Sequence, residues 1–218
     1  MSKLKSVIFL ISVLAFFICF IQFAGAENTL KVVTSSQDLE SITKFIGGNR
    51  VEVTSLAKGY QNPHFVPPKP SFMLKLKNAD LLVEVGMDLE VWLNPLIEGS
   101  RNKQIYNSAL GFVDASYGIS AIEHPANIID RSMGDVHPFG NPHYWLDPVN
   151  AKYISANIAN GLKRIDPQHA AYYEQNRQQF LRELSKKLTE WLNESRALKG
   201  EKVITYHDSW PYFARRFG

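Results

Sequence analysis

The chain has no glycine or proline between Pro167 and Gly200, so this whole stretch can form one uninterrupted helix. Both residue types are disfavoured in helix interiors. Proline lacks a backbone N–H donor, and glycine loses more conformational entropy on folding than other residues do. Asp166 before Pro167 is typical of a helix start, with a capping carboxylate ahead of proline at the first helical position. One stripe carries the large apolar side chains, namely Tyr173, Phe180, Leu184, Leu188 and Trp191. We predict a helix from Gln168 to about Leu198, roughly 45 Å long.

Short apolar runs in the first half of the chain alternate with segments of helical character. Val51-Glu-Val-Thr-Ser-Leu alternates apolar and polar residues, as a strand with one buried face does. Gly47-Gly48 ends the helix before it. We predict, in order, strand 30–34, helix 36–46, strand 51–56, helix 71–79, strand 80–85 and helix 89–98. This order is typical of a parallel sheet with helices on both faces.

The second half predicts a different organisation. Asp147-Pro148 has the same capping pattern as Asp166-Pro167 and should open a helix that runs to about Arg164. Beyond Gly200, Lys202–Tyr206 is predicted to form a strand and Ser209–Phe217 the start of a helix. The predicted fold is therefore α/β, with two parallel-sheet lobes joined by one long rigid helix and the second lobe incomplete. The expected boundaries are 27–165 for the first lobe, 166–199 for the linking helix and 200–218 for the beginning of the second lobe.

The first 26 residues predict a cleaved signal peptide. Lys3 and Lys5 precede an apolar run from Val7 to Ile21, and Ala24-Gly25-Ala26 supplies the small residues that a signal peptidase requires. The apolar run is shorter than the about 20 residues that span a bilayer. We therefore expect export to the periplasm.

The only cysteine, Cys19, lies inside this predicted signal peptide. The residue before it, Ile18, is not the small residue that a lipid-attachment signal requires, so we do not expect a lipoprotein. The mature chain would then hold no disulfide and no cysteine-ligated metal, which suits an exported protein with a core of adequate size.

The charge balance argues against a nucleic-acid partner. The formal net charge is +3, and removal of Lys3 and Lys5 with the signal peptide brings it close to neutral. Basic residues do not cluster with aromatic residues into a patch, as nucleic-acid-binding proteins require.

The mature length fits one large domain or two small ones. We expect a monomer.

Three of the six histidines follow predicted strands or lie in a motif of their own. His64 follows strand 51–56, His143 lies in Asn-Pro-His-Tyr-Trp-Leu-Asp-Pro, and His207 directly follows the predicted strand 202–206. Ligand-binding groups in α/β folds lie beyond the carboxyl ends of strands. The three are far apart in the sequence, so a shared metal site depends on the fold. Surface or capping histidines are the alternative.

Three segments resemble successive signatures of one protein family. They are Asn62-Pro-His-Phe, Asn141-Pro-His-Tyr-Trp-Leu-Asp-Pro148 and Thr205-Tyr-His-Asp-Ser-Trp-Pro-Tyr-Phe. This series is similar to that of the periplasmic zinc- and manganese-binding proteins of metal ABC transporters, the cluster A-I solute-binding family. The likeness extends from about Leu30 to Gly218.

The resemblance implies that His64, His143 and His207 are metal ligands between two lobes. It implies a binding protein, not an enzyme, that captures Zn²⁺ and delivers it to the permease of an ABC importer. Mn²⁺ is the alternative ion, but a histidine at the third ligand position resembles zinc-binding members, whereas glutamate there resembles manganese-binding members. Imidazole nitrogens suit zinc, which also outranks manganese at nitrogen sites.

This chain departs from the family pattern in two places. The family's first-ligand loop has Asp-Pro-His followed by Glu-Pro, and here the loop has Asn62-Pro-His and Val66-Pro67. The family's fourth ligand, a carboxylate in the distal half of the second lobe, has no counterpart before Gly218. One strand and part of a helix also cannot bury a core of their own. We therefore expect the chain to be truncated at its C-terminus.

The remaining histidines have simpler interpretations. His137 lies six residues before His143 and is either an auxiliary ligand or a loop residue. His124 is expected to be solvated in a loop, and His169 to face water in the first turn of the long helix. Asp208 either orients His207 or caps the helix that follows.

Two other classes of function compete with metal transport. A zinc-dependent hydrolase of the periplasm would need an open coordination position and a general base. The sequence has no His-Glu-x-x-His segment and no Gly-x-Ser-x-Gly elbow. An adhesin or a structural role is the third class, and no feature of the sequence favours it.

Overall fold

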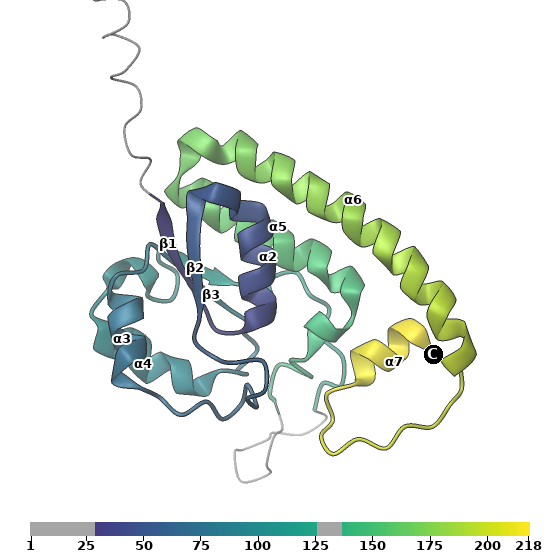
Figure 1. The fold of residues 1–218 in the computed structure, drawn as a ribbon. Coiled ribbons are helices and arrows are strands. Elements are labelled where there is room, and N and C mark those ends of the chain that lie inside the picture. The colour runs from purple at the N-terminus through teal and green to yellow at the C-terminus, as the bar shows by residue number, and fades with distance from the viewer. Residues whose placement is uncertain (1–28, 126–136) are drawn as a thin grey trace, which may run out of the picture.

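A four-stranded parallel sheet forms the centre of the molecule in the computed structural model, which describes residues 29–125 and 137–218 (Figure 1). The strand order is β2-β1-β3-β4. Val32 of β1 is aligned with Val53 of β2 on one side and with Leu81 of β3 on the other. The strands are β1 (Leu30–Thr34), β2 (Val51–Ser55), β3 (Leu81–Glu84) and β4 (Phe112–Asp114).

Helices cover both faces of this sheet, so the predicted α/β class is confirmed (Figure 1). On one face, Val32 and Val83 pack against α2 (Gln37–Gly47) and α5 (Ala151–Ile165). On the other face, Leu82 packs in a second core with α3 (Pro70–Lys77) and α4 (Asn94–Ser100). Alternate residues of each strand thus enter opposite cores, as the pleat of a buried parallel strand requires.

The strand at the β4 edge was missed by the sequence analysis. β4 has three residues, too few for an alternating pattern to be recognised. It pairs with β3 in parallel, with Val113 beside Val83. Gly161 lets α5 approach this strand closely, because a Cβ at that position would lie 2.3 Å from a methyl group of Val113.

The long helix is confirmed as α6 (Ala170–Glu194), with a 3₁₀ turn at each end. The predicted capping role of Asp166 is wrong. Its carboxylate accepts hydrogen bonds from Tyr173 Oη at 2.6 Å and from His169 Nδ1 at 2.8 Å instead of capping the helix. His169 is therefore paired with a carboxylate and only partly exposed, and the expectation that it simply faces water is also wrong.

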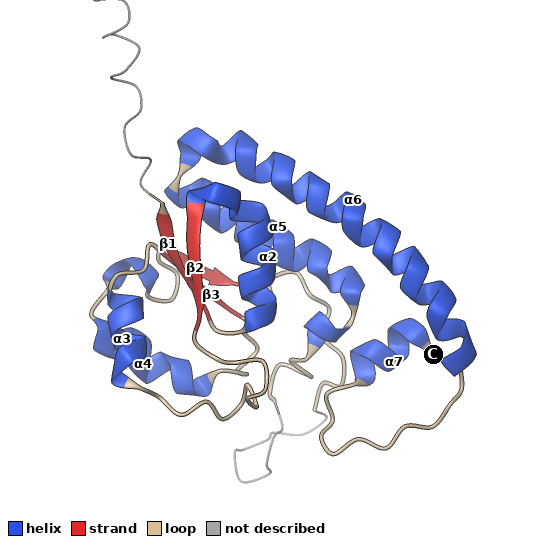
Figure 2. Cartoon of the chain, viewed as in Figure 1, coloured by secondary structure: helices blue, strands red, loops and turns tan. Residues whose placement is uncertain are grey.

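The predicted strand at Lys202–Tyr206 is also wrong. These residues form an exposed loop between α6 and α7 (Pro211–Phe217), and Ile204 is 99% exposed (Figure 2). β-branched residues favour a strand only where a neighbouring strand can accept their backbone hydrogen bonds. No strand of the described residues pairs with this segment. The division into lobes and linker stays a prediction.

The predicted signal peptide and Cys19 lie outside the described residues. Among the helices in the described parts of the chain, none combines the length and the apolar character that crossing a bilayer requires.

Candidate metal site

Three imidazoles that are distant in the sequence meet at one point. The Nε2 atoms of His64, His143 and His207 form a triangle with 3.2 Å along each side. His64 and His143 are buried, and His207 is partly exposed. The structure therefore brings together all three histidines that the sequence analysis selected.

The size of this triangle suits a tetrahedral metal ion. Zinc binds imidazole nitrogen at about 2.0–2.1 Å, which sets neighbouring ligand atoms of a tetrahedron roughly 3.3 Å apart. The observed 3.2 Å separations differ little from that value. The three nitrogens can thus form one face of a tetrahedron with only small adjustment.

Two identical turns orient His64 and His143. Both follow the sequence Asn-Pro-His, and in each the asparagine Oδ1 accepts a hydrogen bond from the main-chain N–H of the histidine at 3.0 Å. Asparagine often stabilises a turn through such a bond to the residue two positions later. His64 comes after β2, and the hydroxyl of Tyr144, the residue after His143, donates to the main-chain oxygen of Val85 just after β3. Both turns therefore lie near the carboxyl ends of parallel strands.

A second contact fixes the turn of His64. The indole N–H of Trp92 donates to the main-chain oxygen of Pro63 at 2.8 Å. Val66, just after the histidine, is buried in the core between the sheet and helices α3 and α4. The His64 turn is therefore held both by its own asparagine and by the core beneath it.

Asn141 joins the loop of His143 to the loop of His207. Its side-chain amide N–H donates to the main-chain oxygen of Asp208 at 2.9 Å and to Glu123 Oε2 at 2.8 Å. Its Oδ1 accepts from the main-chain N–H of His143. One buried side chain thus connects three separate segments around the site.

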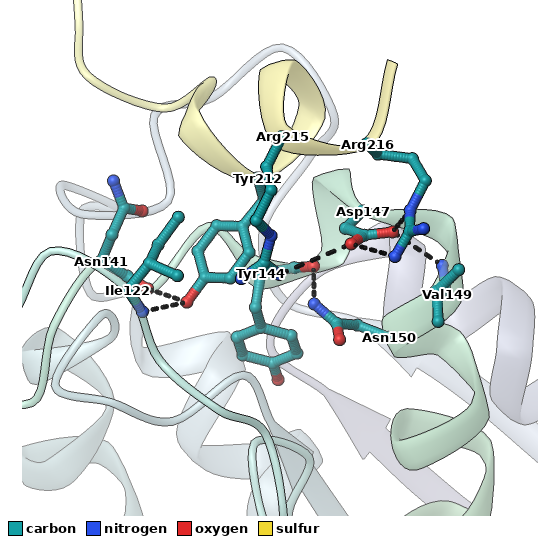
Figure 3. A network of polar contacts seen from close by, with 9 residues as sticks. All are labelled: Ile122, Asn141, Tyr144, Asp147, Val149, Asn150, Tyr212, Arg215 and Arg216. Atoms are coloured by element: carbon teal, nitrogen blue, oxygen red, sulfur yellow. Dashed lines mark hydrogen bonds and ion pairs between the residues drawn. The ribbon is translucent and has the colours of Figure 1, made fainter. Parts of the chain in front are cut away.

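Helix α7 is held against the first lobe by Tyr212, which lies in the core of the lobe (Figure 3). The Tyr212 hydroxyl donates to the main-chain oxygen of Asn141 at 2.9 Å and accepts from the N–H of Ile122 at 3.2 Å. Because α7 follows His207 directly, this contact also limits the movement of the His207 loop.

An ion pair forms the second contact of α7. The Asp147 carboxylate is buried and accepts from Arg216 Nε at 2.8 Å and from Arg216 Nη2 at 2.9 Å (Figure 3). It also accepts from the N–H of Val149 at 3.0 Å, as predicted for a capping residue. A bidentate arginine–carboxylate pair is geometrically specific. It fixes α7 relative to the segment that carries His143.

The protonation state of His143 suits metal binding. Burial, together with the neighbouring imidazoles of His64 and His207, lowers the pKa of His143 from 6.5 to about 3. Its imidazole is therefore neutral at physiological pH, and neutral imidazole is the form that binds metals.

A group of carboxylates lies near the carboxyl ends of β3 and β4 and was not recognised in the sequence. Burial and the neighbouring carboxylate of Glu90 raise the pKa of Glu84 from 4.5 to about 9. Burial raises the pKa of Glu90 to about 7, although the N–H groups of Val85 and Gly86 donate to its carboxylate. This group has no histidine of the cluster among its hydrogen-bond partners in the described chain.

The other candidate residues lie outside the triangle. His124 is exposed, as expected. The ring of His137 lies beside that of His64, with 4.9 Å between centroids. Asp208 contributes its main-chain oxygen to Asn141, and α7 begins at Pro211 with Trp210 as its N-cap. Asp208 therefore does not cap that helix.

Three supporting residues were missed by the sequence analysis: Asn141, Tyr212 and Arg216. The repeated Asn-Pro-His was the available signal for Asn141, because asparagine next to a selected histidine is a common turn residue. Tyr212 and Arg216 act through contacts with distant segments, which no local pattern reveals.

The fold and the cluster define a class of protein, an α/β protein that gathers imidazoles beyond the carboxyl edge of its parallel sheet. Residues 32–218 match the family described as ZnuA, zinc-uptake complex component A periplasmic. The chain belongs to this family.

Comparisons with individual proteins agree with this membership. The chain is 27% identical over 204 residues to the manganese ABC transporter substrate-binding lipoprotein PsaA of Streptococcus mitis, covering 89% of this chain and 62% of that protein. It is 26% identical to the metal ABC transporter substrate-binding lipoprotein FimA of Streptococcus parasanguinis, with the same coverage. The chain thus spans about three-fifths of the length of these relatives.

Comparison with solved structures also finds members of this family. A ZnuA deletion mutant with zinc bound has a TM-score of 0.74 and 29% sequence identity, with 87% of this chain and 67% of that chain covered. A second structure of ZnuA has a TM-score of 0.72 and 28% identity, with 87% of this chain and 68% of that chain covered.

Proposed function

We propose that the protein captures zinc outside the inner membrane and delivers it to an ABC importer. The single observation that carries this proposal is the triangle of Nε2 atoms of His64, His143 and His207, with its 3.2 Å sides. Membership of the zinc-uptake family adds independent support. His64, His143 and His207 are the proposed ligands.

Zinc is the proposed ion, with manganese as the alternative. Imidazole nitrogens bind zinc more strongly than manganese in the Irving–Williams order. The similar ZnuA mutant has zinc bound, whereas PsaA and FimA are described as manganese and metal transport proteins. The three proposed donor atoms are nitrogens, which supports zinc as the ion.

The proposed location is the periplasm, and the proposed partners are the metal ion and the membrane permease of the importer. The named relatives PsaA and FimA are lipoproteins, which weighs against the expectation that this chain carries no lipid. Mass spectrometry of the protein purified from its host distinguishes a free N-terminus after Ala26 from a lipid-modified Cys19. A monomer is proposed for the binding form.

The hydrolase alternative receives no support from the comparisons, since neither the matched family nor the relatives named above are hydrolases. We therefore propose stoichiometric binding without turnover.

Calorimetric titration of zinc into metal-stripped protein tests the proposal. We expect one ion per chain, and replacement of His64, His143 or His207 by alanine should each weaken binding by at least about tenfold, roughly 1.4 kcal/mol. His124→Ala and His169→Ala are the matched controls and should leave the affinity unchanged. Equal, small effects at all five positions would refute the assignment.

A further inference from the structure

Trp145 lies against the imidazole of His143, one of the three proposed ligands. The centroids of the two rings are 5.1 Å apart, and the ring planes are tilted by 58°. Both residues belong to one short turn. His143 is the N-cap of the 3₁₀ turn Tyr144–Leu146, and its main-chain oxygen accepts from the N–H of Leu146 at 3.1 Å. The turn therefore keeps the indole next to the imidazole.

The backbone is fixed on both sides of His143. Asn141 Oδ1 accepts from the N–H of His143 at 3.0 Å, and the hydroxyl of Tyr144 donates to the main-chain oxygen of Val85 at 2.7 Å. The contacts of the imidazole with the other two proposed ligands use Nε2. Zinc would replace these Nε2 contacts. The packing of Trp145 against the ring, in contrast, remains in the loaded site as a contact that orients the imidazole.

The indole of Trp145 is itself fixed by its surroundings. It is partly buried and packs against the core that α2 and α5 form with the sheet. Its ring lies edge-on to that of Tyr144, with 6.0 Å between the centroids. It also lines a groove of about 470 Å³, to which Trp191 of α6 and Phe213 and Phe217 of α7 contribute. An indole that is packed in this way can restrict the movement of a neighbouring ring.

We propose that Trp145 is a positioning residue for zinc binding, which holds the imidazole of His143 in the orientation that directs Nε2 toward the ion. This inference rests on the proposed function of the three histidines. Neighbours that fix the orientation of a metal-binding histidine contribute to metal affinity, and their loss typically weakens binding by about tenfold or more. In this protein an aromatic ring makes such a contact with His143.

The contact between the two rings should be stronger when zinc is bound. Zinc withdraws electron density from the imidazole, so the ring becomes more positive, and an indole attracts a positive neighbour more strongly than a phenyl ring does. A contact that strengthens on loading adds to zinc affinity, whereas a contact that is equal in both states adds only to the stability of the fold. Zinc affinity should therefore decrease from tryptophan to phenylalanine to leucine at position 145.

Zinc titration into the metal-stripped full chain tests this order. We expect Trp145→Phe to bind zinc about threefold more weakly and Trp145→Leu about tenfold more weakly than the unmodified protein. Trp191→Leu is the matched control, because it removes an indole from the same groove at an exposed position of α6, and its affinity should be unchanged. Circular dichroism shows whether each variant is folded, and Trp145→Met takes the place of Trp145→Leu if the leucine variant is not.

Visible absorption of the cobalt-loaded protein is the second measurement. The absorption bands of Co²⁺ report the arrangement of the ligands around the ion, which a purely structural role of Trp145 would leave unaltered. We expect the bands to change in Trp145→Leu, to change less in Trp145→Phe, and to stay as in the unmodified protein in Trp191→Leu.

Two results would overturn the proposal. One is unchanged zinc affinity or unchanged cobalt bands in Trp145→Leu, or in Trp145→Met where that variant replaces it. The other is an equal loss of affinity in Trp145→Leu and Trp191→Leu, which would assign the effect to packing in the groove. Failure of the unmodified protein to bind zinc would instead refute the proposed function, so the two failures are distinguishable.

Discussion

The guanidinium of Arg216 and the carboxylate of Asp147 join the helix that follows His207 to the segment that follows His143. Both contacts are short, 2.8 and 2.9 Å, and the Asp147 side chain is 1% exposed. The pair thus connects two proposed ligands that are 64 positions apart in the sequence.

Replacement of Arg216 by alanine should weaken both the fold and the site. The buried Asp147 carboxylate would keep its bond from Val149 and its ion pair with Arg215 at 3.5 Å, but it would lose its bidentate partner. Because Arg216 is partly exposed, we expect a loss of about 2 kcal/mol of stability, below the range for a fully buried pair. Urea unfolding measures this, and zinc affinity should fall by about tenfold as α7 loses its position.

Arg182→Ala on α6 is the control for this change. Arg182 is exposed, and its guanidinium donates to the side chain of Gln179 on the same helix. Its loss should alter neither stability nor zinc affinity. Equal effects of the two arginine replacements would contradict the proposed role of the Asp147–Arg216 pair.

We expect the side-chain amide of Asn141 to be required for tight zinc binding, whereas the side-chain amide of Asn62 is not. Both asparagines accept from the N–H of the following histidine, and aspartate can do the same. Within the described residues, only the amide of Asn141 also donates, to Glu123 and to Asp208. Asn141→Asp would place two carboxylates together and remove a link between the ligand loops.

Stopped-flow release of zinc to a chelator measures the consequence. We expect Asn141→Asp to release zinc faster and to bind it about tenfold more weakly, whereas Asn62→Asp should behave as the unmodified protein. Similar rates for the two variants would mean that the amide N–H groups of Asn141 do not contribute.

Local patterns predicted most of the first lobe correctly. Strands 30–34 and 51–56 and the helix ended by Gly47-Gly48 were found within a few residues, because apolar periodicity and capping residues act over short distances. The prediction failed at β4, which is too short to have a period. It also failed at Lys202–Tyr206, whose β-branched side chains indicate a strand only when a partner strand is present.

The candidate metal site was only partly predictable. Spacing alone could not reveal that His64, His143 and His207 meet, because their convergence depends on strand order and on the docking of α7. The resemblance to a known family selected them. The roles of Asn141 and Arg216 could not be predicted, since each depends on a contact between segments that are distant in the sequence.

The free energy of unfolding of the metal-free protein should fall as the pH rises from about 5 toward 9. The pKa of Glu84 is raised to about 9 in the folded protein by burial and by nearby carboxylates, whereas an unfolded glutamate ionises near its usual value of 4.5. The folded state therefore binds more protons between these values, and stability decreases with pH at up to about 1.4 kcal/mol per unit for one proton.

Urea unfolding of metal-free protein at a series of pH values measures this slope. Glu84→Gln, which resembles the protonated carboxyl, should flatten the dependence. Glu98→Gln, at an exposed position on α4, is the control and should leave it unchanged. A steep dependence that persists in Glu84→Gln would assign the effect to another group.

The last prediction concerns the choice of metal. With zinc and manganese at equal concentration, dialysis of metal-stripped protein should load mainly zinc, because nitrogen donors at His64, His143 and His207 rank zinc above manganese. His207→Glu replaces one nitrogen by a harder oxygen donor, so the proportion of bound manganese should rise while total binding falls. Mass spectrometry of the metal content measures both ions, and His124→Glu, at an exposed position outside the cluster, controls for added charge. A product loaded mainly with manganese in the unmodified protein would contradict the prediction, and an unchanged ratio in His207→Glu would remove His207 from the residues that determine selectivity.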